Sequence, residues 1–233
     1  MAIHFTFLGH AGVSVQTASG KTILIDPWLS GNPVATQSVN DIAACDLLLL
    51  THAHGDHTGD VLTIAKKFRP VVVAIYDLTT LLGNMGVENM VGINKGGGVD
   101  ISGIRVTGTH AFHSSTLTMP DGTVAYAGEP MGFVVDAEGY RFYHAGDTAL
   151  FGDMELIGKF HSPELAFLPI GDHFTMNARE AAYAAKLLGV KRVVPIHWGT
   201  FSLLTGTPAQ LREHLAGTGI ECVELKPGQS LSL

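Results

Sequence analysis

The sequence predicts an α/β chain in which two β-sheets are flanked by helices within a single domain, residues 1–233. Short strand patterns separated by glycines fill the first third of the chain. The apolar stretches 47–50 and 71–75 are continuous rather than alternating, which is typical of strands covered on both faces. Two later segments have the residues that begin and end helices. No linker rich in Pro or Ser interrupts this pattern, which favours one domain.

Each element follows from its local pattern, and the first three strands are expected to form a meander. A helix over 61–68 is ended by Pro70. Asn177 with Glu180, and Thr207 with Gln210, form capping boxes for helices that end near residues 189 and 217. The glycine-rich stretch 94–98 lacks the ending of a phosphate loop, so we interpret it as a hairpin tip. The predicted strands are 3–7, 13–17, 22–25, 46–51, 71–75, 104–109, 123–127, 132–136, 140–144, 165–170 and 192–196.

Composition excludes several classes of protein. With 46% hydrophobic and 15% charged residues the chain is not disordered, and its longest apolar run, residues 71–76, is far shorter than the roughly 20 residues of a membrane span. The first twenty residues contain no Lys or Arg, so we expect no signal peptide and a cytoplasmic protein. A net charge of -7 disfavours long nucleic acids as partners. The two distant cysteines are expected to be free thiols.

The most informative segment is Thr-His-Ala-His-Gly-Asp-His, residues 51–57, which directly follows a buried strand. In an extended segment His52 and His54 point the same way, and Gly55 would then let the chain turn sharply and bring Asp56 and His57 to a second point nearby. Imidazoles and a carboxylate gathered at a strand end are best satisfied by a divalent cation. The alternative is a hydrated polar loop.

Further His and Asp residues lie just beyond the ends of other apolar strands. Asp147 follows strand 140–144, His197 follows strand 192–196, and either His110 or His113 follows strand 104–109. Open sheets commonly gather their ligands at the carboxyl ends of the strands, so these donors can meet the 51–57 segment. The spacing allows this arrangement without requiring it.

The pattern His52-x-His54-x-Asp56-His57, with a later His, an Asp after a strand and a final His, resembles the metallo-β-lactamase superfamily over nearly the whole chain. The similarity is greatest to its short, uncharacterised metal-dependent hydrolases, which are related to the ascorbate-6-phosphate lactonases. Matching stretches include Asp26-Pro-Trp, Ala-Phe-His-Ser-Ser at 111–115, His-Ala-Gly-Asp-Thr at 144–148, Leu-Pro-Ile-Gly-Asp at 168–172 and Pro-Ile-His at 195–197. The resemblance implies a four-layer αββα sandwich.

The resemblance also implies a site with two divalent metal ions. One ion would be held by His52, His54 and His113, the second by Asp56, His57 and His197, with Asp147 bridging both. The choice of His113 over His110 depends on the Ala-x-His-Ser-Ser match. With only nitrogen and oxygen ligands, zinc is the first expectation, and Mn, Fe, Co or Ni also suit the site.

Residues around the ligands have candidate roles of their own. We expect Asp26 to orient His52 or His54, since metal-bound imidazoles usually have such a partner. His144 is either a site residue or a buried, hydrogen-bonded histidine. Asp172 and His173 precede a helix N-terminus, where an anion could bind. The candidate catalytic residues are Asp56 and His173, His173 as the proton donor, and the candidate substrate-binding residues are His110, Asp172 and His173.

These observations predict a metal-dependent hydrolase that uses a metal-bridging hydroxide to cleave a small ester, lactone or phosphate-containing substrate. One alternative is a phosphodiesterase or nuclease acting on nucleotides; another is a metal-binding protein without turnover. The expected partner is a small-molecule substrate, with no long nucleic acid and no membrane, and the sequence is compatible with a homo-oligomer. The Gly-x-Ser-x-Gly motif of serine hydrolases is absent.

Overall fold

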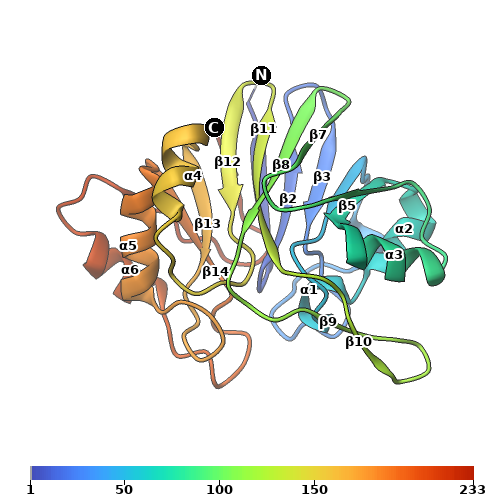
Figure 1. The fold of residues 1–233 in the computed structure, drawn as a ribbon. Helices are drawn as coiled ribbons and strands as arrows, with labels where there is room; N and C mark the ends of the chain where they lie inside the picture. The colour runs from blue at the N-terminus through green and yellow to red at the C-terminus, as the bar shows by residue number, and fades with distance from the viewer. Residues whose placement is uncertain (1) are drawn as a thin grey trace. The chain divides into compact units, whose positions relative to one another are not determined.

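The computed structural model describes residues 2–233, and the chain divides into two compact units. The first unit contains residues 2–95, 114–130 and 226–233, and the second contains residues 96–113 and 131–225. Each unit has its own seven-stranded mixed sheet and its own helices (Figure 1). Among the described residues no helix is both long enough and apolar enough to cross a bilayer.

The sheet of the first unit has the strand order β16-β1-β2-β3-β4-β5-β6. The strands from β16 to β3 pair antiparallel, and those from β3 to β6 pair parallel. Its strands are β1 (His4–Gly9), β2 (Gly12–Gln16), β3 (Thr22–Ile25), β4 (Leu47–Leu49), β5 (Val71–Ile75), β6 (Met90–Ile93) and β16 (Ser230–Ser232). Its helices are the 3-10 turn η1 (Val39–Asp41), α1 (Gly55–Thr58), α2 (Val61–Phe68) and α3 (Tyr76–Asn84).

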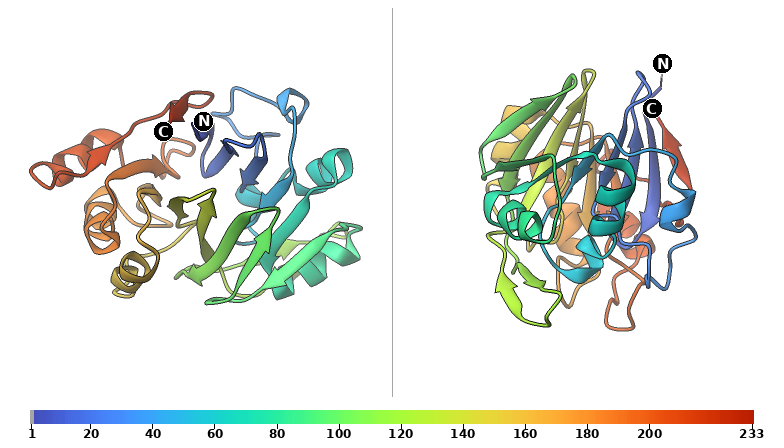
Figure 2. Two further views of the ribbon diagram at one scale, coloured as in Figure 1. Left: turned by 90° about the horizontal axis from the view of Figure 1, so that it is seen from above. Right: turned by 90° about the vertical axis from the view of Figure 1, so that its right-hand side faces the viewer.

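The central strands of this sheet have the sequences expected of strands covered on both faces. All three leucines of β4 are buried, as are four of the five residues of β5. A separate hairpin of β9 (Thr116–Thr118) and β10 (Val124–Tyr126) projects beyond α1 in the same unit (Figure 2). The parallel order places the segments that follow β3 and β4 at one edge of the sheet, where Asp26 and the 51–57 segment lie.

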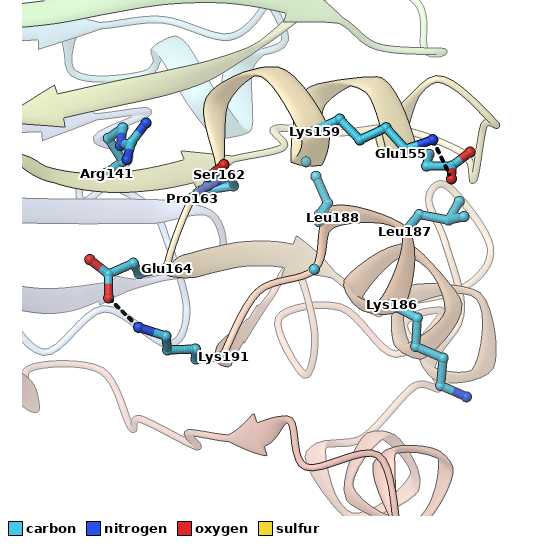
Figure 3. A pocket seen from close by; sticks show the side chains of 12 residues that line it. Arg141, Glu155, Lys159, Ser162, Pro163, Glu164, Lys186, Leu187, Leu188 and Lys191 are labelled. Carbon is cyan, nitrogen blue, oxygen red and sulfur yellow. Dashed lines mark hydrogen bonds and ion pairs between the residues drawn. The ribbon is translucent and has the colours of Figure 1, made fainter.

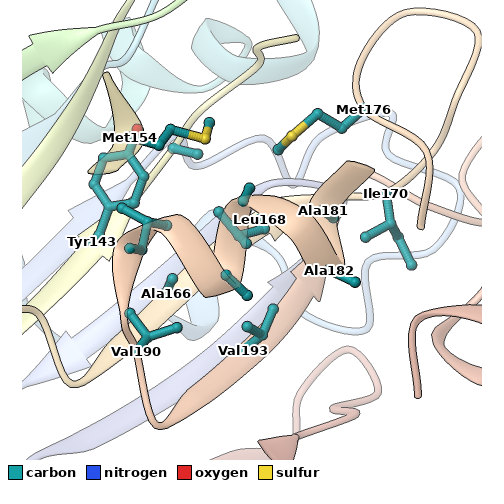
Figure 4. Packing of buried hydrophobic residues seen from close by; sticks show 14 of the residues in the cluster. Tyr143, Met154, Ala166, Leu168, Ile170, Met176, Ala181, Ala182, Val190 and Val193 are labelled. Atoms are coloured by element: carbon teal, nitrogen blue, oxygen red, sulfur yellow. The ribbon is translucent and has the colours of Figure 1, made fainter. Parts of the chain in front are cut away.

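The sheet of the second unit has the order β15-β14-β13-β12-β11-β8-β7. Helix α5 covers its inner strands with one alanine-rich face that is fully buried against β13 and β14, so helix and sheet pack closely (Figure 4). The strands are β7 (Gly98–Ile101), β8 (Ile104–His110), β11 (Met131–Ala137), β12 (Tyr140–His144), β13 (Leu165–Pro169), β14 (Arg192–Ile196) and β15 (Glu221–Cys222), and the helices are α4 (Met154–His161), α5 (Ala178–Leu188) and α6 (Pro208–Leu215).

Five strands of the second unit, β8, β12, β13, β14 and β15, end at the same edge, and the predicted site residues follow the first four. Strands β12, β13 and β14 are parallel, and β8 runs in the same direction because both β8 and β12 pair antiparallel with β11. The segments that begin at His110, Ala145, Ile170 and His197 therefore leave the sheet at one edge. We call these four segments, residues 110–113, 145–153, 170–178 and 197–206, the edge loops.

Most predicted elements are confirmed, several with unchanged boundaries: α2, β3, β5, β12 and β14. Both capping boxes are present, and both cysteines are free. The prediction of a hairpin tip at 94–98 is wrong, because β6 is the last strand of one sheet and β7 belongs to the other. Instead the backbones of Gly96 and Gly97 form hydrogen bonds with Gly108 in β8. The sequence pattern did not predict β6, β7, β9, β15, β16, α3 or α4.

Candidate metal centre

In the first unit, Asp26 connects the 51–57 segment to the sheet. It lies directly after β3, is completely buried, and has a left-handed backbone with φ 45°. Its Oδ1 accepts a hydrogen bond from the Thr51 amide at 2.8 Å, and its Oδ2 accepts from the Thr51 hydroxyl at 2.6 Å and from His57 Nδ1 at 2.9 Å. Since a carboxylate only accepts, His57 must have its proton on Nδ1, and its lone pair is on Nε2.

The same chain of hydrogen bonds determines the tautomer of His52. The Thr51 hydroxyl gives its proton to Asp26, so it accepts from His52 Nδ1, 3.0 Å away. The lone pair of His52 therefore lies on Nε2, which is 3.0 Å from Nδ1 of His54. Two imidazole nitrogens bound to one tetrahedral zinc ion are about 3.4 Å apart, so this pair fits a divalent cation after a small shift.

Asp26 was expected to orient His52 or His54. The structure places it on His57 directly and on His52 through Thr51, whereas His54 contacts the hydroxyl of Ser114 at 3.4 Å through Nε2. One ligand atom each of Asp26, His52 and His57 lies within 4.8 Å of the others. Because the oxygens of Asp26 already accept three hydrogen bonds, its role is to orient the imidazoles of His52 and His57 rather than to bind a metal ion itself.

The turn at Gly55 differs from the expected one. Gly55 does not have a positive φ, and the chain turns by entering α1, where the amides of His57 and Thr58 both donate to the His54 carbonyl at 3.0 Å. Asp56 and His57 consequently lie on the first turn of a helix. The glycine with a steric role is Gly59, where a Cβ would come 2.7 Å from the Trp28 ring.

His10 is a site residue that sequence reasoning missed. It lies between β1 and β2 with φ 56°, its side chain is fully buried, and its Nε2 is 3.1 Å from Oδ2 of Asp56. Its ring also packs edge-on against Trp28 and His57, with centroids 5.4 and 5.6 Å away. The signal that could have found it is the one used for Asp147 and His197, because His10 also lies just beyond the end of an apolar strand.

In the second unit, Asp147 joins two of the predicted ligands. Its Oδ2 is 3.0 Å from Nε2 of His197 and 3.5 Å from Nε2 of His113. The carboxylate is almost completely buried, and the three residues come from three different edge loops. His113, rather than His110, is the histidine of its loop that reaches Asp147. The ring of His110 instead packs against Phe112 and Phe151, at 4.3 and 5.4 Å.

The other predicted residues of this unit lie outside that group. His144 is fully buried at the end of β12, where it stacks on Phe167 and accepts a hydrogen bond from the Gly146 amide at 3.2 Å. Asp172 and His173 form a tight left-handed turn, in which the ring of His173 contacts Phe174 at 4.4 Å. The expected anion position before α5 is already served by its own capping box, through Glu180 and Asn177.

The two mixed sheets flanked by helices, with imidazole and carboxylate groups at the strand ends of each sheet, place the chain in the class of proteins with the metallo-β-lactamase fold. The family model of the β-lactamase superfamily domain matches residues 21–198. The solved structure of Igni18, a metallo hydrolase from Ignicoccus hospitalis, matches this chain with a TM-score of 0.90 and 31% sequence identity. The match covers 100% of this chain and 99% of Igni18. The predicted fold class is therefore confirmed.

More particularly, the chain belongs to the UPF0173 metal-dependent hydrolase family. The relative from Rubrobacter xylanophilus is 46% identical over 229 residues, which are 97% of this chain and 95% of the relative. The relative from Roseiflexus castenholzii is also 46% identical, over 235 residues, 97% of this chain and 96% of its own. Both are named UPF0173 metal-dependent hydrolases. A metal-dependent hydrolase, as predicted from the sequence, is thereby confirmed at this level.

Proposed function

We propose that the two units act as one domain in which their donors together hold two divalent ions, zinc first among the candidates. His52, His54 and His113 would hold one ion, Asp56, His57 and His197 the other, and Asp147 would bridge them. The observation that supports this proposal best is the set of hydrogen bonds around Asp26. These bonds place the protons of His52 and His57 on Nδ1 and leave Nε2 of each ring as a ligand.

Two such ions would supply a water of lowered pKa as a nucleophile at neutral pH and would stabilise negative charge on a substrate oxygen. The chain's own residues position the metal ligands. Asp26 and Thr51 orient imidazoles, and Asp147 gathers His113 and His197 within 3.5 Å. Six of these groups are buried, whereas His54, Asp56 and His113 are partly exposed, so a substrate could reach the site from their side; the buried ones are Asp26, Thr51, His52, His57, Asp147 and His197. The substrate class that suits this chemistry is a small ester, lactone or phosphate-containing molecule.

His173 is the proposed proton donor to the leaving group. It follows β13, and the edge loop that contains it leaves the sheet at the same edge as Asp147 and His197. Its side chain is exposed, so it can reach a bound molecule and exchange protons with water. Replacement His173→Gln should lower kcat most for substrates with poor leaving groups.

The deciding experiment is elemental analysis of metal-replete protein combined with a panel of esters, lactones and phosphoesters. We expect two ions per chain and turnover that disappears on chelation. Chelation should also lower the melting temperature, because ions that bind only the folded state stabilise it by about 2.7 kcal/mol at 100 times their Kd. Fewer than two ions, or an unchanged melting temperature in verified metal-free protein, would contradict the proposal.

Two outcomes would replace the proposed reaction by another. Much faster cleavage of bis-p-nitrophenyl phosphate than of any ester or lactone would indicate a phosphodiesterase. No turnover of any panel member by protein that holds both ions would indicate a metal-binding protein without catalysis.

A further inference from the structure

The edge loops of the second unit expose aromatic side chains beside the predicted ligands. Phe112 directly precedes His113 and is 56% exposed, and Phe174 directly follows His173 and is 50% exposed. Phe201, four residues after His197, is 37% exposed. Exposed large apolar side chains gathered at one place usually mark a binding surface.

Backbone hydrogen bonds join the segments that contain two of these phenylalanines to the segment that follows Asp147. The Phe112 amide donates to the Thr148 hydroxyl at 3.0 Å, and the Phe112 carbonyl accepts from the Ala149 amide at 3.1 Å. On the other side, the Met176 amide donates to the Thr148 carbonyl at 3.1 Å and so ties the turn that contains Phe174 to the same residue. Thr148 itself is completely buried. The segments that contain Phe112 and Phe174 are therefore both hydrogen-bonded to the residues that directly follow Asp147.

The Phe112 ring is supported from beneath as well. It packs edge-on against Phe151, at 5.7 Å between centroids, and against His110 at 4.3 Å. Phe151 is buried, whereas the outer part of Phe112 is left uncovered. A ring held in this way loses little conformational freedom when an apolar ligand covers it.

The edge loops contain no Lys or Arg, whereas several such side chains lie at the other edge of the same sheet. A cavity of about 620 Å³ at the edge where β12, β13 and β14 begin is lined by Arg141, Lys159, Lys186 and Lys191, two of them paired with glutamates (Figure 3). A phosphoryl group is normally held by such cations. The cationic residue nearest to them in the sequence is Arg179, which directly follows the third edge loop on the first turn of α5.

We propose that Phe112 and Phe174 form a binding surface for the apolar acyl group of an uncharged ester or lactone. This inference rests on the proposed function and selects among its substrate classes, because a phosphate group on the part of the substrate away from the ions would meet apolar rings and no Lys or Arg in the edge loops. The two rings are specificity-determining residues, and they act by covering the alkyl part of the substrate while Asp147 and its histidines face the carbonyl.

The test compares p-nitrophenyl acetate with p-nitrophenyl hexanoate, which differ by four methylenes and share a leaving group. A fully buried methylene contributes about fourfold, so partial covering should raise kcat/KM for hexanoate about tenfold over acetate. In the double variant Phe112→Ala/Phe174→Ala the ratio should fall to about one, mainly through KM. The matched control is Phe160→Ala, which removes a 78% exposed ring from α4 and should keep the wild-type ratio.

Binding without turnover gives an independent readout. The neutral fluorophore N-phenyl-1-naphthylamine should bind metal-free protein, with a Kd raised about tenfold in the double variant and unchanged in Phe160→Ala. Equal binding by wild type and double variant, or an acyl-chain ratio that the double variant keeps, would overturn the inference. Faster cleavage of bis-p-nitrophenyl phosphate that is lost in Arg179→Ala would overturn it too. If no ester is cleaved by protein with both ions bound, the proposed function fails. Binding of the fluorophore then still tests whether Phe112 and Phe174 form an apolar binding surface.

Discussion

Nε2 of His10 lies 3.1 Å from Oδ2 of Asp56, although the two residues are 46 positions apart. A neutral or charged imidazole can donate to a carboxylate, so His10 fixes one Asp56 oxygen and leaves the other for a cation. The imidazole is fully buried and is supported by Trp28. Its backbone is left-handed with φ 56°, a conformation that costs a non-glycine residue free energy, so the turn holds His10 against a local preference.

Replacing His10 should weaken metal binding near Asp56. We expect His10→Ala to lower the affinity for the ion that Asp56 would hold about 10- to 100-fold, the usual effect of losing a partner of a metal ligand. His10→Gln, whose amide nitrogen reaches as far as Nε2, should retain most of the affinity. Titration against a competing chelator measures both. Equal loss in the two variants would show that the imidazole acts only by packing.

The carboxylate of Asp26 should be required for both stability and metal binding. Asp26→Asn keeps the shape and tolerates the left-handed backbone, but its single carbonyl oxygen cannot accept all three hydrogen bonds, which reach both oxygens of Asp26 from the Thr51 amide, the Thr51 hydroxyl and His57. We expect the free energy of unfolding to fall by about 3 kcal/mol and bound metal to decrease. Urea unfolding and elemental analysis test the two effects separately.

Asp60→Asn provides the matched control. Asp60 is also buried, but its Oδ2 accepts only from the amides of Leu29 and Ser30, and the carbonyl oxygen of an asparagine can accept both bonds. Asp60→Asn should therefore cost less stability and leave the metal content unchanged. Similar metal loss in the two variants would contradict a specific role for Asp26.

The sequence predicts the inner strands of each sheet well because their signals are local. The apolar runs of β4 and β5, and the capping boxes of α5 and α6, lie within the elements that they define. By contrast, β16 forms only by pairing with β1, more than 220 residues away, and β6 and β7 look like one hairpin until each joins its own sheet. Short edge strands have little sequence signal, because tertiary pairing determines them.

For the candidate site, the sequence identifies chemistry better than contacts. The ligand-rich segment 51–57 is unmistakable from residue types, and the rule of donors after strand ends points to Asp147 and His197. It does not distinguish His110 from His113, because both follow β8, and only the turn of the chain decides which ring reaches Asp147. The aromatic surface is not predictable from the sequence, since the hydrogen bond that joins the Phe112 backbone to Thr148 links residues 36 positions apart.

Ionisation of Cys45 should lower the free energy of unfolding as the pH rises above 9. Burial, and then the charge of Asp46, raise the pKa of the Cys45 thiol to about 12, from 9.0. Because the folded-state value is the higher one, this stabilising contribution is complete below pH 9 and is lost as the pH rises through 12. Between pH 8 and 10.5 the wild type should lose about 2 kcal/mol more unfolding free energy than Cys45→Ala. Equal losses in urea unfolding would show that the thiol ionises freely.

Gly171 should be required to position His197. It follows β13, and a Cβ at this residue would overlap the backbone carbonyl of His197 and come 3.0 Å from Leu204 and 3.2 Å from His197 Nδ1. The His197 backbone is left-handed with φ 54°, so it has little freedom to move aside. We expect Gly171→Ala to lower the free energy of unfolding by about 1–3 kcal/mol and to reduce bound metal, because the imidazole is displaced from Asp147.

The control for this prediction is Gly152→Ala in the same unit, where a Cβ would meet no atom within 4 Å and φ is not positive. It should leave both the unfolding free energy and the metal content close to wild type. If Gly171→Ala loses stability but keeps its full metal content, then His197 tolerates displacement and its proposed role as a ligand is wrong. If it loses metal at unchanged stability, the close approach of the two backbones acts on the site alone.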